Sequence, residues 1–368
     1  MAITTTAAVL RAPGGPLSVE EAVVEDPRPD EVLVRIVGSG ICHTDLGLVA
    51  TASPEQLPLI LGHEGSGVVE AVGSEVTGLV PGDHVVLSYA YCGACDNCRR
   101  GVQMHCQSFM GLNFGGARAD GTTAYRIGGE KLHGHFFGQS SWSQYVVTSP
   151  RNIVKVDPSL PLQILGPLGC GIQTGAGAVL NTLDPQPGSS IVVFAAGSVG
   201  LAAVMAAKAA GCASIIVVEP QPGRRALAQE LGATHAMDPT RQDVVQEINE
   251  ITQGGAQYSV DCLGLPSVVR QALECLASPG VCASVGFQGP DNEITFNQGH
   301  LLFGRTLVGV IEGDADPHTF IPRMLDLFRA GQLPFDRFVQ AFPIAKINDA
   351  IEAAHQGQVI KAVVTFGD

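Results

Sequence analysis

Basic residues are scarce in this chain, and charged residues of either sign are few. Lys and Arg total 21 against 35 Asp and Glu, so the formal net charge is −14, and only 15% of the 368 residues are charged. An acidic surface repels phosphate backbones, which argues against a nucleic-acid partner. Because 45% of the residues are hydrophobic, the chain has ample material for a folded core, and the composition excludes intrinsic disorder.

Long apolar runs are also lacking. No run reaches the roughly 18 residues that a membrane span requires. The N-terminal sequence MAITTTAAVLRAPGG has no basic start followed by an apolar block. We therefore expect a cytoplasmic protein with no membrane partner. The ten cysteines agree with this expectation, since four lie within residues 92–106 at metal-like intervals and the others are scattered through apolar segments.

Glycine, by contrast, is abundant, with 45 residues. The length of the chain predicts two domains. In roughly the first 160 residues, short apolar segments at 31–37, 65–72 and 84–87 are separated by turn residues such as Pro81-Gly82-Asp83. Short strands with this punctuation are typical of a small β-barrel or sandwich.

Candidate metal ligands occur early in this β-rich region. Cys42 and His63 lie beside residues of catalytic type, which are Thr44, Asp45 and Glu64. Zn²⁺ prefers thiolate and neutral imidazole, and an open catalytic zinc normally has three protein ligands. Cys170, which stands between two glycines, can supply the third. For any one of these residues alone, a buried cysteine or histidine of the core is the competing interpretation.

A second group of cysteines has a stricter spacing. Two residues separate Cys92 from Cys95 and Cys95 from Cys98, and Cys106 follows eight residues later. A tight turn brings thiolates at this spacing onto one metal, and four of them close a tetrahedral shell, which predicts a structural zinc. Disulfides at this spacing would be strained, a redox pair needs only two cysteines, and an iron–sulfur cluster would favour a proline after the last ligand.

The tract at 111–141 is polar and rich in glycine, and it contains His133 and His135 on either side of Gly134. We expect a solvated loop here, with a metal site as the alternative. Aromatic residues follow, and they are predicted either to line a pocket or to form plain core. They are Phe136, Phe137 and Trp142.

From Ser190 the pattern becomes strand, glycine turn, helix, strand and acid. An apolar strand at 190–194 precedes the turn AAGSVG at 195–200, an Ala-rich helix follows, and a second apolar strand at 215–218 ends at Glu219. Glycines let the backbone approach a pyrophosphate, and a helix N-terminus offers free N–H groups. The acid accepts hydrogen bonds from ribose hydroxyls, so the pattern predicts a dinucleotide site. Ala195 replaces the usual first glycine, which should alter the turn slightly without abolishing it, since alanine fits there if its φ stays negative.

Helices and strands continue to alternate along the chain. We expect helices at 224–231 and 267–277 and strands at 258–263 and 281–287. This alternation predicts an α/β protein with a doubly wound parallel sheet. The last helices, near 318–330 and 347–355, and a strand at 361–366 are too short to form a domain, and we expect them to return to the first region.

Together these motifs resemble the zinc-dependent alcohol dehydrogenases of the medium-chain dehydrogenase/reductase superfamily over essentially the whole chain. The resemblance rests on residues 40–45 and 62–67, the four-cysteine lobe, residues 169–171 and the turn that ends in Glu219. The segment GCGIQTGAGA at 169–178 is similar to aryl-alcohol (benzyl-alcohol) and geraniol-type dehydrogenases. The resemblance implies a β-rich GroES-like catalytic domain at 1–171 and 312–368, with its structural zinc lobe at 92–106, and a Rossmann domain at 172–311.

The resemblance also implies roles for the residues near the catalytic zinc. Asp45 would orient His63, and Glu64 would lie close behind the metal. Thr44 would bind the substrate oxygen and start a proton path. Gly47 stands where many relatives have the histidine that ends this path, so water or His43 would replace it. The catalytic zinc ligands would be Cys42, His63 and Cys170, and the structural zinc ligands would be Cys92, Cys95, Cys98 and Cys106.

The implied reaction is the reversible oxidation of a primary alcohol to its aldehyde by hydride transfer to NAD, with two Zn²⁺ per chain. The residues expected to contact NAD are His43, Thr174, Gly197, Val199, Gly200, Glu219, Arg224 and Lys361. Glu219 would repel the 2′-phosphate of NADP, although Arg224 and Arg225 leave dual specificity open. A pocket with aromatic walls would suit benzylic or allylic alcohols better than ethanol. Its predicted lining residues are Thr44, Phe136, Phe137, Trp142 and Phe287.

The resemblance further implies a homodimer or homotetramer, with the apolar segment 301–311 as a pairing edge. An S-(hydroxymethyl)glutathione (formaldehyde-type) dehydrogenase has the same zinc residues, but it needs a basic site for the carboxylate of its adduct, which this acidic chain does not obviously offer. Outside enzymes, a zinc-ribbon interaction module is disfavoured by the charge of −14. A zinc-free reductase or a structural protein on the same fold would be expected to lack the catalytic ligands.

Overall fold

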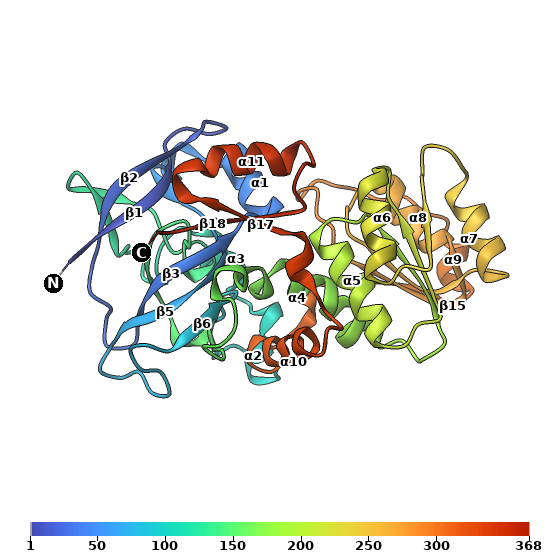
Figure 1. The fold of residues 1–368 in the computed structure, drawn as a ribbon, viewed down its shortest axis with the longest axis horizontal. Coiled ribbons are helices and arrows are strands. Elements are labelled where there is room, and N and C mark those ends of the chain that lie inside the picture. Colours follow the sequence, from blue (N-terminus) through green and yellow to red (C-terminus); the bar gives the residue numbers. More distant parts are fainter. Residues whose placement is uncertain (1, 368) are drawn as a thin grey trace. The chain divides into compact units, whose positions relative to one another are not determined.

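The computed structural model describes residues 2–367, so the ends of the predicted catalytic domain, residues 1 and 368, lie outside the described residues. The chain divides into two compact units (Figure 1). The first contains the described residues of Met1–Cys170, Asp316–Pro322 and Asp336–Asp368, and the second contains Gly171–Ala315 and Arg323–Phe335. Residues 312–315 and 323–335, which the sequence assigned to the catalytic domain, thus cluster with the second unit. The domain boundaries themselves stay a prediction.

The first unit is built from two antiparallel or mixed sheets. One has five strands in the order β4-β1-β2-β7-β8, and the other has β10-β6-β5-β3-β18-β17 with β9 also paired to β3. The strands of the first sheet are β1 (Ile3–Leu10), β2 (Leu17–Val24), β4 (Leu59–Ile60), β7 (Tyr125–Ile127) and β8 (Glu130–Leu132). Those of the second are β3 (Val32–Gly40), β5 (Glu64–Val72), β6 (His84–Leu87), β9 (Tyr145–Thr148), β10 (Ile153–Lys155), β17 (Val339–Pro343) and β18 (Lys361–Thr365).

The core of the second sheet follows from the alternation of its strands. Val32, Val34 and Ile36 of β3 are buried together with Val69 of β5 and Val146 of β9, because alternate side chains of a strand point to the same face. The helices of this unit are short. They are α1 (His43–Thr51), α2 (Asp96–Arg99), α3 (Phe109–Phe114) and α11 (Ile347–His355), and α10 (Pro317–Arg329) begins in this unit.

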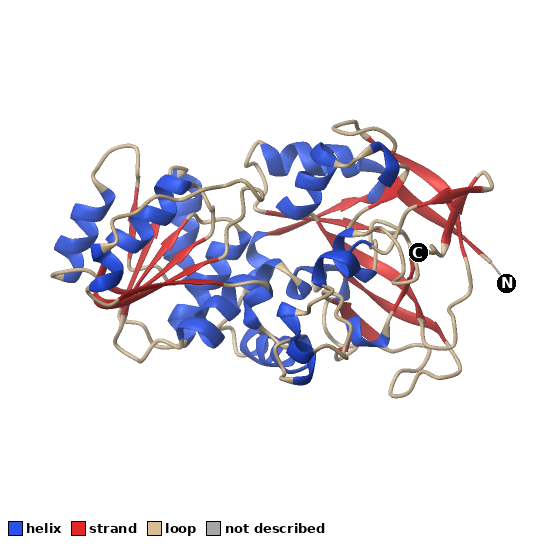
Figure 2. Cartoon of the chain, turned by 180° about the vertical axis from the view of Figure 1, so that it is seen from behind, coloured by secondary structure: helices blue, strands red, loops and turns tan. Residues whose placement is uncertain are grey.

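The second unit contains a six-stranded parallel sheet in the order β13-β12-β11-β14-β15-β16. Figure 2 shows helices on both sides of this sheet. After their first serine, β11 and β12 are continuous apolar runs, as expected of parallel strands covered on both faces. The elements are α4 (Gly171–Gly177), β11 (Ser190–Phe194), α5 (Ser198–Ala209), β12 (Ser214–Val218), α6 (Pro222–Leu231), β13 (His235–Met237), α7 (Val244–Thr252), β14 (Ala256–Asp261), α8 (Pro266–Glu274), β15 (Leu276–Ser284), α9 (Gly299–Leu302) and β16 (Arg305–Gly309).

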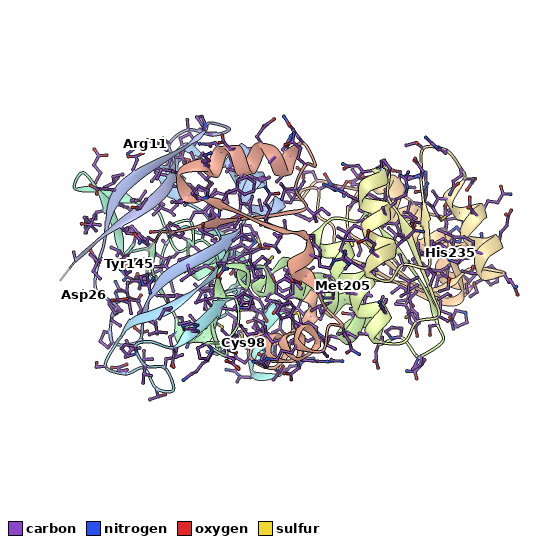
Figure 3. All side chains as sticks on the ribbon, in the orientation of Figure 1. Arg11, Asp26, Cys98, Tyr145, Met205 and His235 are labelled. Atoms are coloured by element: carbon purple, nitrogen blue, oxygen red, sulfur yellow. The ribbon has the colours of Figure 1, made fainter. Side chains whose placement is uncertain are left out.

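The predicted fold class is confirmed, since a doubly wound parallel sheet and a β-rich body are both present. Met205 of α5, labelled in Figure 3, is fully buried, as the apolar helix after the glycine turn requires. Among the described residues, no helix is both long enough and apolar enough to span a bilayer.

One predicted helix was too long. The sequence placed a helix at 267–277 and a strand at 281–287, whereas α8 ends at Glu274 and β15 begins at Leu276. Leu276 pairs with Ala256 of β14, and both residues are fully buried in the apolar core of the sheet. Burial of this leucine in the sheet outweighs the helical pattern of the preceding residues.

The tract at 111–141 was also wrongly predicted as a solvated loop. It contains part of α3 and the strands β7 and β8, and His135 is buried with its Nε2 accepting a hydrogen bond from the backbone N–H of Ala124 at 3.1 Å. His133 does not join His135 in a metal site: among the described residues, neither belongs to a group of candidate metal ligands. The backbone of this tract forms hydrogen bonds with neighbouring strands, for example β7 with β2 and β8. The polar composition of the tract did not reveal this pairing.

The buried His135 predicts a loss of stability in mild acid. Burial, together with the charges of Arg118 and Arg28, lowers the pKa of His135 to about 3. The unfolded chain binds this proton below its ordinary pKa, so the histidine destabilises the fold as the pH falls below about 6.5. Between pH 7 and pH 5 the expected cost is about 2 kcal/mol. The test variant is His135→Asn, because asparagine tolerates the positive φ of 63° at this position. Measured by urea unfolding, the free energy of unfolding of this variant should fall by about 2 kcal/mol less between pH 7 and pH 5 than that of the unmodified protein. Equal pH dependence in both proteins would contradict this role.

Candidate active site

Four side chains from three separate segments meet in the first unit. Candidate ligand atoms of Cys42, His63, Glu64 and Cys170 all lie within 4.8 Å of one another. Cys42 stands at the N-terminus of α1, His63 and Glu64 lie at the start of β5, and Cys170 follows a short helical turn at Gly166–Gly169. The structure thus brings together the three predicted zinc ligands and the carboxylate expected beside them.

Asp45 fixes the orientation of the His63 ring. Its Oδ1 lies 2.9 Å from Nδ1 of His63 and also accepts a hydrogen bond from the backbone N–H of Gly62 at 3.0 Å. Its Oδ2 accepts from the backbone N–H of Cys42 at 3.0 Å. One buried carboxylate therefore positions both a histidine and a cysteine of the cluster, as expected for the residue behind a metal ligand.

The arrangement of His63 fits a zinc ion. With Nδ1 facing the carboxylate, Nε2 faces the two thiols, and Nε2 is buried without a hydrogen-bond partner in the described structure. A buried ring nitrogen without a partner is costly. A metal bound by Nε2 and by the sulfur atoms of Cys42 and Cys170 would satisfy it, and this donor set is one that Zn²⁺ prefers.

Glu64 has an unexpected neighbour. The Nζ of Lys361 in β18 donates hydrogen bonds to both carboxylate oxygens of Glu64, at 2.8 and 2.9 Å, and to the carbonyl of Ile41 at 3.1 Å. Both side chains are buried. Burial alone would lower the pKa of Lys361, but the carboxylate of Glu64 outweighs it, and the pKa is raised well above its ordinary value.

Lys361 was predicted to face the pyrophosphate of NAD, and its ammonium instead lies in this buried ion pair. The pairing was missed because the two residues are 297 positions apart in the sequence. The only signal was the basic residue at the start of the last strand, and the residue type alone does not reveal a partner. Gly40 makes room for the pair, since a Cβ at this position would lie within bonding range of the Glu64 carboxylate oxygen.

Aromatic rings pack against His63. The ring of Phe137 stacks on the imidazole with centroids 4.4 Å apart, and Phe136 meets it edge-on at 5.5 Å. Phe114 contacts both phenylalanines. Trp142 is fully buried against Gly62, and its Nε1 donates to the carbonyl of Gly40 at 3.4 Å. Three of the predicted lining residues therefore surround the segment that carries His63.

The remaining predicted residues near the site are more exposed. Thr44 Oγ1 lies 3.7 Å from the sulfur of Cys42. A substrate oxygen beside the ligand cluster would therefore be within reach of the Thr44 hydroxyl. His43 is exposed at the start of α1, and Gly47 on the same helix has open space where a side chain would project. Phe287 belongs to the second unit and is 78% exposed, and its place in the pocket stays a prediction.

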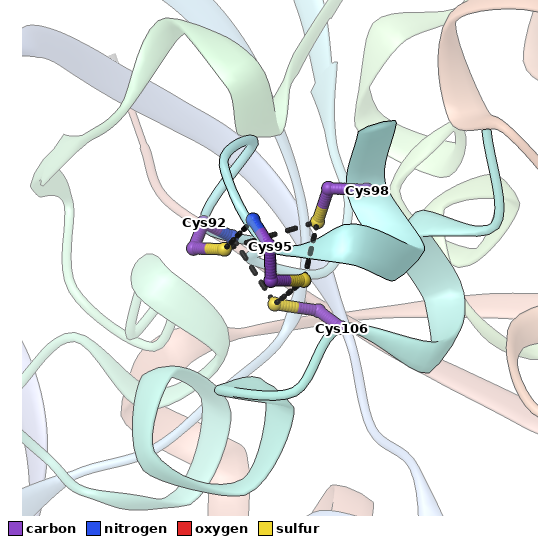
Figure 4. A group of neighbouring side chains, drawn as sticks. All are labelled: Cys92, Cys95, Cys98 and Cys106. Atoms are coloured by element: carbon purple, nitrogen blue, oxygen red, sulfur yellow. Dashed lines mark hydrogen bonds between the residues drawn. The ribbon is translucent and has the colours of Figure 1, made fainter. Parts of the chain in front are cut away.

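The four-cysteine lobe has the geometry of a metal site (Figure 4). Sulfur atoms of neighbouring cysteines lie 3.5 to 4.0 Å apart, and a tetrahedral zinc with Zn–S bonds of 2.3 Å requires about 3.8 Å. Backbone N–H groups of residues 92, 94, 95 and 108 point at these sulfurs. Backbone N–H groups of Cys98 and Gln107 lower the pKa of Cys95 to about 6, whereas burial raises the pKa of Cys98 to about 12, so the fit to a metal rests on the positions of the four sulfur atoms. The lobe therefore fits a structural zinc.

The glycine turn of the second unit fits a dinucleotide. Gly197 precedes α5 and has open space where a Cβ would stand, so a phosphate can approach the backbone. A Cβ on Gly200 would lie 1.9 Å from the carbonyl oxygen of Ala195, so this glycine permits the close packing of helix against turn. Glu219 is buried at the end of β12, and its carboxylate accepts hydrogen bonds from the backbone N–H groups of Ala196 at 2.8 Å and Gln221 at 2.9 Å.

Three further residues that were expected to contact NAD belong to the second unit, whereas His43 and Lys361 belong to the first. Arg224 in α6 has a buried Nε without a hydrogen-bond partner among the described residues, which leaves it able to bind an anion. Val199 is in the first turn of α5, where its carbonyl packs against Gly175 of α4. Thr174 is in α4, beside Gly175.

Ala195 does not have the negative φ on which its fit in the turn was expected to depend. Its φ is 77°, in the left-handed region that favours glycine. Ala195→Gly should therefore raise the free energy of unfolding by about 0.5–1 kcal/mol, because the relief of strain exceeds the greater flexibility of glycine in the unfolded chain. Ala196→Gly is the matched control, since Ala196 does not have a positive φ and should be destabilised by the same change. Urea unfolding measures both, and a loss of stability in Ala195→Gly would contradict the assignment of strain.

The fold and both sites can be compared with known proteins. The family model of the alcohol dehydrogenase GroES-like domain matches residues 28–158, and that of the zinc-binding dehydrogenase matches residues 198–330. This chain belongs to the zinc-dependent alcohol dehydrogenases, and it is therefore an oxidoreductase.

Individual relatives are similar over nearly the whole length. Geraniol dehydrogenase from Castellaniella defragrans is 48% identical and covers 99% of this chain and 98% of its own. The crystal structure of benzyl alcohol dehydrogenase from Acinetobacter calcoaceticus is 41% identical, with a TM-score of 0.96 over 99% of this chain and 100% of its own. S-(hydroxymethyl)glutathione dehydrogenase from Haemophilus influenzae is 36% identical over 99% of this chain and 98% of its own.

Proposed function

We propose that this enzyme reversibly oxidises a primary aromatic or allylic alcohol, of the benzyl alcohol or geraniol kind, to its aldehyde, with NAD as the hydride acceptor. The observation that carries the substrate class is the group of aromatic rings against His63. Phe136 and Phe137 are buried against His63 and make the surroundings of the candidate metal ligands apolar, and a larger apolar alcohol gains more from an apolar site than ethanol does. The geraniol and benzyl alcohol dehydrogenases among the relatives support the same class.

Each residue of the cluster has a defined task in this proposal. A Zn²⁺ held by Cys42, His63 and Cys170 would supply the Lewis acid that eases loss of the alcohol proton. Asp45 holds His63 by its Nδ1 proton and so keeps Nε2 directed at the metal position. Thr44 Oγ1 accepts the alcohol proton and passes it on, and water or the exposed His43 receives it, because Gly47 has no side chain to do so. Phe137 covers one face of the His63 ring and excludes water there.

The preference for NAD rests on charge at the end of β12. The carboxylate of Glu219 would face the adenosine ribose and repel a 2′-phosphate. Arg225 cannot readily compensate, because its Nη1 donates to the carbonyls of Glu219 and Pro220, both at 2.7 Å, and pairs with Asp238 at 3.3 Å. A cytoplasmic location belongs to the same proposal, since the thiols of both metal sites must stay reduced.

The experiment compares initial rates of NAD⁺ and NADP⁺ reduction with benzyl alcohol, geraniol, ethanol and S-(hydroxymethyl)glutathione. The proposal predicts NAD⁺-linked oxidation of the two larger alcohols. Dominant activity on the glutathione adduct would favour the second candidate, to which the 36% identical relative points. No oxidation of any alcohol by protein that holds two zinc ions would contradict both candidates.

We further propose that two or more copies assemble through the free edge of β16, as a homodimer or homotetramer. This strand is the last of the six-stranded sheet, and the helix before it exposes Leu302 and Phe303, which are 72% and 73% accessible. An unpaired strand beside exposed apolar residues favours pairing with a second copy. Light scattering should give a multiple of the 38.2 kDa chain mass, and Phe303→Asp should reduce it. A monomer at micromolar concentration would contradict the proposal.

A further inference from the structure

Gln139 is a fully buried amide with partners at the start of β5 and just after the end of β6. Its Oε1 accepts a hydrogen bond from the backbone N–H of Gly65 at 3.0 Å. Its Nε2 donates to the carbonyl of His63 at 2.9 Å and to the carbonyl of Ser88 at 3.2 Å. One side chain therefore binds the residues on both sides of Glu64 and connects them to the end of β6.

The orientation of this amide is determined by its partners. Gly65 offers a donor, while His63 and Ser88 offer acceptors, so the oxygen and the nitrogen cannot be exchanged without losing all three bonds. A Cβ on Gly65 would lie 2.9 Å from the amide oxygen and 2.8 Å from the Cβ of Ser141. The small residue after Glu64 thus allows the amide to approach the backbone.

The connection continues to the second ligand segment. The hydroxyl of Ser88 donates to the carbonyl of Gly169 at 2.7 Å, and Gly169 directly precedes Cys170. A Cβ on Gly169 would meet the carbonyl of Leu87 at 1.9 Å, so the two backbones are in close contact here. Gln139 and Ser88 therefore form a buried chain of hydrogen bonds from the His63 segment to the Cys170 segment.

The backbone around Gln139 is strained in the way expected of a positioning segment. His135, Phe137 and Ser140 all have positive φ, at 63°, 51° and 54°. The hydroxyl of Ser140 accepts from the N–H of Phe136 at 2.9 Å and donates to the carbonyl of Ile60 at 2.7 Å. Strain of this kind persists only where surrounding bonds determine the conformation, and it concentrates at functional sites.

We propose that Gln139 is a positioning residue of the catalytic metal site, which fixes the separation of the His63 and Cys170 ligand segments through Ser88. The inference rests on the proposed function, since it assigns the metal to these segments. Gln139 itself touches no candidate ligand atom, and its effect is transmitted by the backbone. Loss of its two donated bonds should loosen one metal site and leave the four-cysteine site intact.

The test uses variants of graded severity in the full-length protein. Gln139→Glu keeps the volume and the acceptor for Gly65 but loses both donations, and Gln139→Met removes the bonds without adding charge. Ser88→Ala breaks only the link to Gly169. Asn113→Asp is the matched control: Asn113 is also fully buried, donates to the carbonyls of Ala90 and Phe109, and accepts from the N–H of Ala90, with no bond to either ligand segment.

The primary measurement is metal retention, with activity as a second readout. Each protein is dialysed against a chelator, and the zinc that remains per chain is counted. Each is then loaded with Co²⁺, whose visible absorption reports the geometry of the site. We expect Gln139→Glu and Gln139→Met to weaken the catalytic site about 10- to 100-fold and to shift its cobalt bands, with a smaller shift in Ser88→Ala. In Asn113→Asp, lower stability should accompany unchanged cobalt bands.

The outcomes separate this inference from the function on which it rests. If the unmodified protein binds one metal and oxidises no alcohol, the proposed function fails. If it binds two and is active, while both Gln139 variants keep two metals with unchanged cobalt bands and kcat/KM, the proposed function stands and the positioning role is overturned. If a Gln139 variant does not fold, the retained metal, the cobalt bands and the kcat/KM of Ser88→Ala decide the question in the same way.

Discussion

Replacing Lys361 with methionine is expected to lower the free energy of unfolding by about 3–5 kcal/mol at neutral pH. The ammonium of Lys361 lies 2.8 and 2.9 Å from the two carboxylate oxygens of Glu64, and both side chains are buried. Removing the ammonium leaves a buried carboxylate that lacks its cationic partner, and the desolvation cost of that charge is no longer offset. Urea unfolding of the two proteins measures the difference.

The double variant Glu64→Gln with Lys361→Met is the control for this expectation. In the double variant a neutral amide faces a neutral methionine, so no buried charge lacks a partner. Its free energy of unfolding should therefore recover most of the loss of about 3–5 kcal/mol in Lys361→Met. The interaction energy from the four proteins isolates the ion pair from the lost bond to the carbonyl of Ile41. If the free energy of unfolding of Lys361→Met is within about 1 kcal/mol of that of the unmodified protein, the buried ion pair is not a major source of stability.

Replacing His63 with alanine is expected to remove one of the two zinc ions and to reduce alcohol oxidation by about 10³-fold or more. His63 supplies the ring nitrogen that lies buried without a partner and faces the thiols of Cys42 and Cys170. A metal that polarises the reacting oxygen contributes several kcal/mol, and each 1.4 kcal/mol corresponds to about tenfold in rate. Zinc content per chain and initial rates with benzyl alcohol measure the two effects.

His133→Asn is the matched control for this second expectation. His133 lies only six positions before Gln139, but among the described residues it belongs to no group of candidate ligands. This variant should keep two zinc ions and nearly full activity. A His63→Ala protein that retains both metals, or that oxidises the alcohol at an unreduced rate, would show that the cluster is not the catalytic site.

The elements that local pattern determines were predicted well from the sequence. The apolar strands β6 and β11 and the helix α11 have the bounds that their patterns indicated. The candidate ligands Cys42 and His63 were found because residue type and glycine-rich surroundings are visible locally. Cys170 could be proposed only in combination with Cys42 and His63, since nothing in its own segment distinguishes it from a core cysteine.

Features that depend on distant contacts were missed. The pair of Lys361 with Glu64 joins the last strand to the fifth, and no local pattern encodes it. The positive φ of Ala195 occurs in a turn whose carbonyl lies close to Gly200, and the residue type alone does not reveal this backbone conformation. Gln139 has an ordinary polar residue type, and only the structure shows that it is buried between two ligand segments.

The most direct test of the proposed function is the ratio of kcat/KM for geraniol and benzyl alcohol to kcat/KM for ethanol, measured with NAD⁺ on protein that holds two zinc ions. An apolar site around His63 predicts ratios of at least about 10²-fold, because burying several additional apolar carbons contributes about 3 kcal/mol or more. Ratios near one would contradict the assignment of substrate class, because the site would then gain nothing from the larger apolar part of the substrate.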